Sequence, residues 1–138
     1  MWSEQQTLTT PGPSITFNAA SGDLYFLDPD QCSWSPDLRV TADPAPRTSG
    51  AVIFPILKGA GHLRLQGRLL PTTDTASARD TMAANLRAAC DAILSANGTY
   101  THPTRGSLTV RCEVYPGFGG AYRKDFVLVL IAADPGSW

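Results

Sequence analysis

One stretch, residues 50–71, constrains the fold of this chain more than any other. It consists of two apolar runs on either side of a glycine-containing segment, Gly59 to Gly61. In the second run three leucines alternate with three polar residues: Leu63, Leu65 and Leu69 with Arg64, Gln66 and Arg68. This alternation predicts a strand with one buried and one polar face. The glycines between the runs predict a hairpin turn, so we expect an antiparallel β-sheet.

The length and composition favour a single folded domain that carries its own core. The chain has 138 residues, of which 43% are hydrophobic and 17% are charged. A chain of this kind can bury a core without the help of disulfides or metal ions. Its formal net charge is −1, which excludes the strongly basic surface of a typical nucleic-acid-binding protein. The sequence shows neither a signal-peptide pattern nor an apolar run of membrane-spanning length. We therefore expect a soluble protein that is made in a cytoplasm.

Shorter patterns predict the remaining strands. Residues 1–13 are polar and end in Pro-Gly-Pro, which predicts an extended arm able to dock on a neighbouring subunit. A single domain is expected to follow over residues 14–138. Its further strands are predicted near residues 14–18, 24–27, 38–41, 98–101, 107–115 and 124–132. The first two of these are expected to pair as a hairpin, and the last is apolar on both faces, which predicts that both faces are covered.

One helix is predicted over about residues 77–96. Ser77 or Asp74 is expected to cap its beginning, and Asn97 with Gly98 its end. Apolar residues recur at helical spacing and predict one stripe that faces the core: Met82, Leu86, Cys90, Ile93 and Leu94. With the strands, this predicts a mainly β fold with one helix, a β-sandwich or small barrel flanked by the α-helix.

The sequence contains no pattern typical of a catalytic, metal or cofactor site. The three cysteines, Cys32, Cys90 and Cys112, lack zinc-site spacing, and their odd number argues against a disulfide framework. We expect them to be buried, reduced thiols. His62 and His102 have no second metal ligand at hairpin or helical spacing. The expectation is therefore a protein without enzyme activity, metal or cofactor.

The polar side chains of the predicted sheet are the candidates for contacts with other molecules. A solvated face, a subunit contact and a channel wall are all compatible with the pattern. Pro55 predicts an edge strand or a bulge, which offers backbone groups to another chain. The tail is expected to expose a terminal tryptophan that docks on a partner. The candidate subunit-interface or channel residues are Arg64, Gln66, Arg68, Arg111 and Trp138.

Several short motifs follow one another in a characteristic order over about residues 14–135. They are Ser-Ile-Thr-Phe-Asn at 14–18, Gly50 before a strand, Leu-Arg-Leu-Gln-Gly at 63–67, a helix closing at Gly98, and Asp-Phe-Val-Leu-Val-Leu-Ile-Ala-Ala-Asp-Pro at 125–135. In this order they resemble the N-terminal domain of the distal tail proteins of long-tailed phages. The resemblance implies a tail-tube-like fold, a β-sandwich with a flanking helix.

The function that this resemblance implies is structural. Six copies of such a domain form a ring that joins the tail tube to the tail tip or baseplate and continues the DNA channel. The implied partners are further copies of the chain, the tube protein and the tip or baseplate hub proteins, and DNA passes without specific binding. The implied location is the virion tail, with no membrane contact and no catalytic residues. The alternatives are another protein of the tail-tube fold, such as a tube subunit or tail terminator, and a stand-alone ligand-binding β-sandwich.

Overall fold

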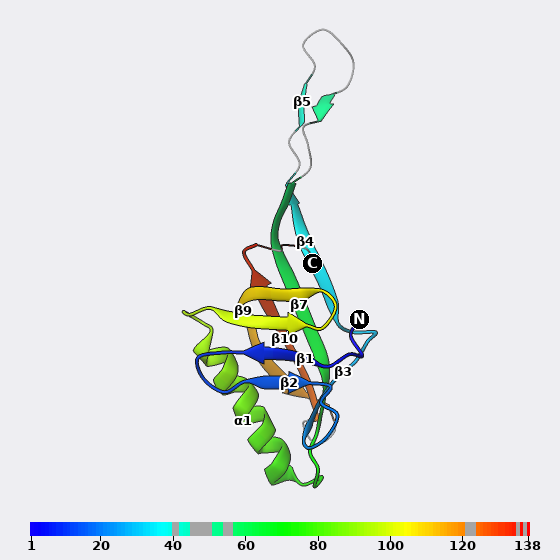
Figure 1. Cartoon of the computed structure of the whole chain (residues 1–138), viewed down its shortest axis with the longest axis vertical. Helices are drawn as coiled ribbons and strands as arrows, with labels where there is room; N and C mark the ends of the chain where they lie inside the picture. The colour runs from blue at the N-terminus through cyan, green and yellow to red at the C-terminus, as the bar shows by residue number, and fades with distance from the viewer. Residues whose placement is uncertain (40–41, 45–50, 54–56, 121–123, 135, 137) are drawn as a thin grey trace.

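The described part of the chain folds into an eight-stranded β-sheet with one helix packed beside it and a separate two-stranded sheet (Figure 1). The computed structural model describes residues 1–39, 42–44, 51–53, 57–120, 124–134, 136 and 138. The strands are β1 (Gln6–Thr9), β2 (Ile15–Phe17), β3 (Leu24–Leu27), β4 (Ser33–Arg39), β5 (Ala42–Pro44), β6 (Ala51–Ile53), β7 (Leu57–Leu70), β8 (Gly98–His102), β9 (Gly106–Gly119) and β10 (Asp125–Ala132), and the helix is α1 (Ala76–Ala92).

The main sheet closes on itself as a seven-stranded barrel. Its strand order is β10-β9-β8-β1-β2-β3-β7, and β10 pairs with β7 to close the ring. The neighbours are antiparallel except β2 and β3, which meet in parallel at Phe17 and Tyr25. Strand β4 pairs with β7 outside the closed ring. The expected mainly β fold with one helix is therefore confirmed, with a small barrel as its form.

Strand β7 organises the barrel because it pairs with three other strands along its length. Its last residues pair with β3, its middle with β10, and its first half with β4. The predicted turn at Gly59 to Gly61 is wrong, since β7 runs straight through these residues. At Gly61 the glycine makes room for an aromatic ring: an added Cβ would lie 2.0 Å from the Cη2 atom of Trp34.

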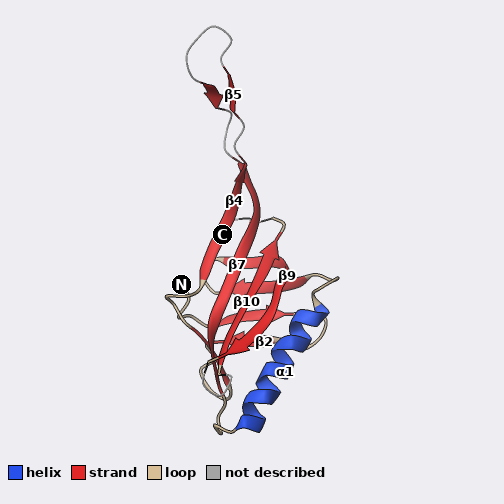
Figure 2. Cartoon of the chain, turned by 180° about the vertical axis from the view of Figure 1, so that it is seen from behind, coloured by secondary structure: helices blue, strands red, loops and turns tan. Residues whose placement is uncertain are grey.

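Strands β4 and β7 extend beyond the barrel where they pair with each other (Figure 1, Figure 2). Between them along the chain, β5 and β6 form a separate antiparallel pair, in which Ala42 lies opposite Ile53. We call the projecting parts of β4 and β7 with this pair the ribbon. The predicted edge position or bulge at Pro55 lies outside the described residues.

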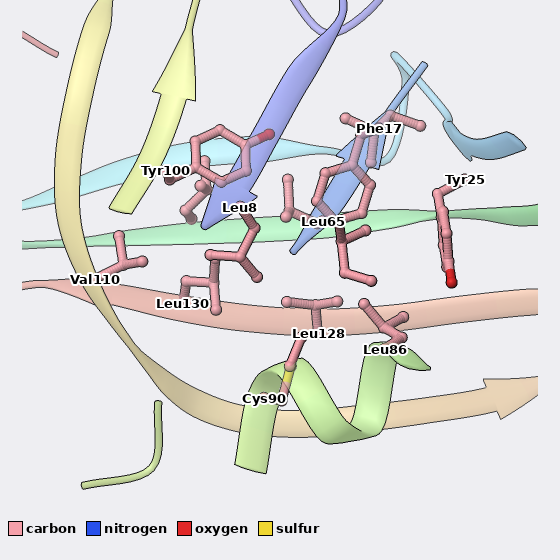
Figure 3. Close-up of a cluster of buried hydrophobic side chains, with 14 of the residues drawn as sticks. Leu8, Phe17, Tyr25, Leu65, Leu86, Cys90, Tyr100, Val110, Leu128 and Leu130 are labelled. Atoms are coloured by element: carbon pink, nitrogen blue, oxygen red, sulfur yellow. The ribbon is translucent and has the colours of Figure 1, made fainter. Parts of the chain in front are cut away.

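The core fills the barrel and the space under α1 (Figure 3). The alternation in β7 is confirmed, because its three leucines are fully buried while Arg64 and Arg68 are exposed. In β10 the inward residues are buried and the intervening ones half-buried. The largest fully buried side chains are Leu8, Phe17, Leu27, Leu63, Leu65, Leu69, Met82, Leu86, Ile93, Tyr100, Phe126 and Leu128.

The predicted N-terminal arm is wrong for Gln6–Thr9, which form a strand inside the sheet. Strand β1 lies between β2 and β8 and pairs with both. Leu8 is fully buried, and the Tyr100 hydroxyl donates a hydrogen bond of 2.5 Å to Oε1 of Gln6. The predicted hairpin of β2 and β3 is also wrong, because these two strands meet in parallel, and the antiparallel neighbour of β2 is β1. The local sequence could not show that β1 joins the sheet, since its partner β8 lies about ninety residues later in the chain.

The helix begins close to the predicted residue but ends at Ala92, before the predicted end near residue 96, and its capping residues differ from those predicted. The hydroxyl of Thr75 accepts a hydrogen bond of 3.1 Å from the amide of Ala78, and Ile93 is the C-cap. Because the helix ends at Ala92, Leu94 leaves the predicted stripe and is 55% exposed, while the stripe's other four residues are buried. In the described part of the chain, no helix is long and apolar enough to cross a membrane.

Candidate interaction surface

The outward side chains of β7, β10 and β9 form one continuous surface. We call it the outer face. Because β10 pairs with both other strands, the register sets its residues side by side in rows. The rows are His62, Ile131 and Arg111; Arg64, Val129 and Val114; Gln66, Val127 and Gly117; and Arg68, Asp125 and Gly119.

The structure brings four of the five predicted contact residues onto this outer face. Nη2 of Arg64 donates a hydrogen bond of 2.8 Å to Oε1 of Gln66. Arg68 forms an ion pair with the neighbouring Asp125 at 3.6 Å. The three arginines of the face are exposed and Gln66 is half-buried. The outer face therefore carries positive charge that is only partly balanced within the chain.

A bulge in the pairing of β9 with β10 gives the outer face an apolar centre. The register shifts on either side of Val129, which turns Val114 outwards, whereas strict alternation in β9 predicts it to face inwards. Val114 is 50% exposed and Tyr115 is 42% exposed. Val114 and the half-buried side chains of Val127, Val129 and Ile131 form an apolar strip between arginines, whereas the Tyr115 hydroxyl turns to Asp91 of the helix. Such a composition is typical of protein contact surfaces.

The outer face offers little room for a small ligand. One open hollow at Phe118 and Val127 has a volume of about 290 Å³, and another at Arg111 and Ile131 about 280 Å³. Small-molecule sites usually enclose most of their ligand, whereas both hollows are open to solvent. No group of three or more metal-ligating side chains occurs among the described residues. The surface is thus better suited to a broad protein contact.

The fifth predicted contact residue, Trp138, is buried, so its predicted exposure is wrong. Its side chain is 3% exposed, and its Nε1 donates a hydrogen bond of 3.2 Å to the carbonyl of Gly106. Its ring centre lies 5.5 Å from that of Trp34 and 5.8 Å from that of Tyr100. Trp138 therefore packs against the chain's own core and is not available to a partner.

A histidine held between two carboxylates lies at the edge of the outer face, where the ribbon leaves the barrel. Nδ1 of His62 lies 2.6 Å from Oε2 of Glu113, and Nε2 lies 3.0 Å from Oδ2 of Asp37. We call these three residues the His62 clamp. The hydrogen bonds to Glu113 and then to Asp37 raise the pKa of His62 above its ordinary value of 6.5. The clamp joins β4, β7 and β9, so spacing within a single element could not predict it.

The His62 clamp is expected to make stability depend on pH. Because folding raises the pKa of His62, the imidazolium contributes stability that is fully present below about pH 6.5. That contribution is lost as the pH rises through the folded-state pKa. A His62→Gln variant should therefore be less stable than the wild type at pH 6, and the difference should shrink by pH 9. Urea unfolding midpoints of both proteins across this range measure it.

Glu113→Gln supplies the control for this prediction. It removes the carboxylate that raises the pKa most, so its loss of stability should also fade with rising pH. If the stability difference between His62→Gln and the wild type stayed constant from pH 6 to pH 9, the bonds from the imidazolium to the two carboxylates would not stabilise the dissolved protein.

Comparison with known proteins relates this fold to a phage protein. No family model matches the sequence, and no curated protein matches it. Among solved structures, the Dit protein (gp 19.1) of SPP1, described as a paradigm of the hub adsorption apparatus in phages infecting Gram-positive bacteria, superposes with a TM-score of 0.55. The match covers 96% of this chain and 51% of the SPP1 protein, at 12% sequence identity. This chain therefore spans about half the length of the SPP1 protein. The chain therefore has a fold that also occurs in a hub protein of a phage adsorption apparatus.

Proposed function

We propose that this chain is a structural protein of a phage tail whose copies assemble into a closed ring between the tail tube and the tail tip. The observation that carries the proposal is the fold shared with SPP1 Dit over 96% of the chain. The motifs at residues 14–18, 63–67 and 125–135 support it independently, because they suggest the same kind of protein from the sequence. The protein would then be a virion component without enzyme activity.

Two surfaces of the chain favour association with further copies. Strand β4 is the last strand of the sheet order, and its far edge pairs with no strand in the described part of the chain. Unpaired strand edges are templates for another chain. The outer face adds an apolar strip flanked by arginines. A closed ring with rotational symmetry satisfies such surfaces in every copy without growing into a fibre.

The partners follow from the position proposed for the ring. On one side it would meet the tube protein and on the other the proteins of the tip or baseplate hub. DNA would pass through the centre without specific binding, in keeping with the net charge of −1. Arg64, Gln66, Arg68 and Arg111 are the residues that we propose for a subunit contact or the channel wall.

Substitution of Val129 by glutamate is expected to prevent assembly while leaving the fold intact. Val129 is half-buried on the outer face, so a charge there can reach water in the single chain but would be trapped in a subunit contact. Light scattering after size exclusion should give a multiple of the 14.7 kDa chain mass for the wild type and one chain mass for Val129→Glu. Circular dichroism should show equal strand content for both.

Thr99→Glu is the matched control. Thr99 is an exposed strand residue of β8, outside the outer face, so this variant should assemble like the wild type. Assembly of Val129→Glu at the wild-type concentration would show that the outer face is not the subunit contact. A wild type that stays at one chain mass at every concentration would contradict the proposed function.

A further inference from the structure

Two cysteines face each other where the helix packs against strand β9. Cys90 is a fully buried residue of α1, and Cys112 is a half-buried residue of β9. The two thiols are neighbours, and each affects the pKa of the other. Figure 3 shows the Cys90 side chain pointing from the helix towards the strands, near Leu128. A backbone hydrogen bond of 3.1 Å from the amide of Cys112 to the carbonyl of Ile93 holds the two elements together at this point.

Besides core packing, the helix and β9 also contact each other at the surface of the protein. Strand β9 pairs with β8 only through its first residues, 106–110. Beyond them its contacts to the helix include the bond from the Tyr115 hydroxyl to Oδ2 of Asp91, 3.2 Å, and the guanidinium of Arg87 over the ring of Phe118, 5.2 Å from its centre. These contacts lie at the surface, beside the core side chains that the helix and β9 bury.

We propose that Cys90 and Cys112 are a redox site, and that a disulfide oxidant such as oxidised glutathione converts them to an intramolecular disulfide that links α1 to β9. In the first step the Cys112 thiolate attacks the oxidant, forms a mixed disulfide and releases one glutathione thiolate. The Cys90 thiolate then attacks Sγ of Cys112 and releases the second. Two protons leave the protein, and its two electrons reduce glutathione.

The environment of the two thiols sets the order and the speed of these steps. Cys112 attacks first because it is half-buried, while Cys90 has no exposed surface. Burial raises the pKa of both thiols, so the thiolate fraction is small at neutral pH. Oxidation should therefore be slow at pH 7 and faster at pH 8.5, since the thiolate is the nucleophile.

The disulfide would strengthen the fold after the protein leaves a reducing compartment. The bond closes the chain between residues 90 and 112, and a loop of this length should raise the melting temperature by roughly 5–10 °C. In a cytoplasm both thiols stay reduced. If the proposed function holds, the disulfide would form once the assembled particle is released. The redox site itself does not depend on the ring.

The experiment uses the full-length chain with Cys32→Ser, which removes the third thiol. Cys32 is buried against the backbone of Gln66, so this variant should fold. After incubation with oxidised glutathione, the intact mass should fall by two hydrogens. Trypsin should then yield peptides 88–105 and 112–123 joined by a bond that dithiothreitol cleaves. Melting curves before and after oxidation give the shift.

Cys32→Ser with Cys112→Ser is the control, and it should gain no stability from the oxidant. Three results would overturn the proposal: both thiols still free to react with iodoacetamide after unfolding, a stable glutathione adduct on Cys112, or an oxidised form that melts no higher than the reduced one. None of these readouts involves assembly, so a failed redox site and a failed ring are distinguishable.

Discussion

Removal of residues 1–13 is expected to abolish folding. These residues contain β1, which lies between β2 and β8 and completes the barrel. Without it, two strands lose their common neighbour, the fully buried Leu8 is missing from the core, and the Tyr100 hydroxyl loses its acceptor on Gln6. Each loss alone costs between about 1 and 5 kcal/mol, against a total stability of about 5–15 kcal/mol for a domain. The truncated chain should lack a cooperative melting transition by circular dichroism.

Two point variants separate the strand's packing from a general effect of altering the N-terminus. Leu8→Ala should lower the free energy of unfolding by about 2–5 kcal/mol, because it leaves a cavity among buried side chains. Thr9→Ala in the same strand should change it by less than about 1 kcal/mol, since Thr9 is exposed. A truncated protein with native strand content and a sharp melting transition would mean that residues 1–13 are an accessory arm after all.

Gly67→Ala is expected to be strongly destabilising although it adds only one methyl group. An added Cβ would lie 1.6 Å from the carbonyl oxygen of Phe26 and 3.0 Å from Cα of Leu27, both in the backbone of β3. Backbone atoms cannot rotate away as a flexible side chain can, so β3 and β7 must separate. We expect a loss of about 3 kcal/mol or more in the free energy of unfolding, measured by urea denaturation.

Gly119→Ala is the matched control for this substitution. Gly119 also lies in a strand of the barrel, but an added Cβ there would meet no atom within 4 Å. The change of residue type is identical, so only the crowding differs. Equal stabilities of the two variants would show that β3 and β7 are not as close at Gly67 in solution as in the structure.

Side-chain patterns predicted which residues of a strand face inwards, but not where strands end or what they pair with. The alternation around Leu65 was correct because burial of one sheet face sets it directly. The predicted turn at Gly61 was wrong because glycine also occurs where another group must approach the backbone, here the ring of Trp34. The sequence could not predict that β1 joins the barrel or that Trp138 is buried, since the residues that contact them lie far away in the sequence.

The candidate surface was predictable in part for the same reason. The polar side chains of β7 share one face by simple alternation, and the structure places Arg111 on that face too. The apolar strip was missed because the bulge in β9 breaks alternation at Val114. The His62 clamp was missed because its carboxylates come from other strands. The thiol pair was expected only as two buried thiols, because helix and strand spacing do not reveal which residues meet.

We propose that copies of this chain close into a ring around an open channel. Electron microscopy of the purified protein distinguishes such a ring from other states, because averaged images show symmetry and a central opening without any partner. We expect ring-shaped particles with rotational symmetry and a hole along the axis. Particles of a single chain, or open filaments of chains, at concentrations where the protein is folded would contradict the claim.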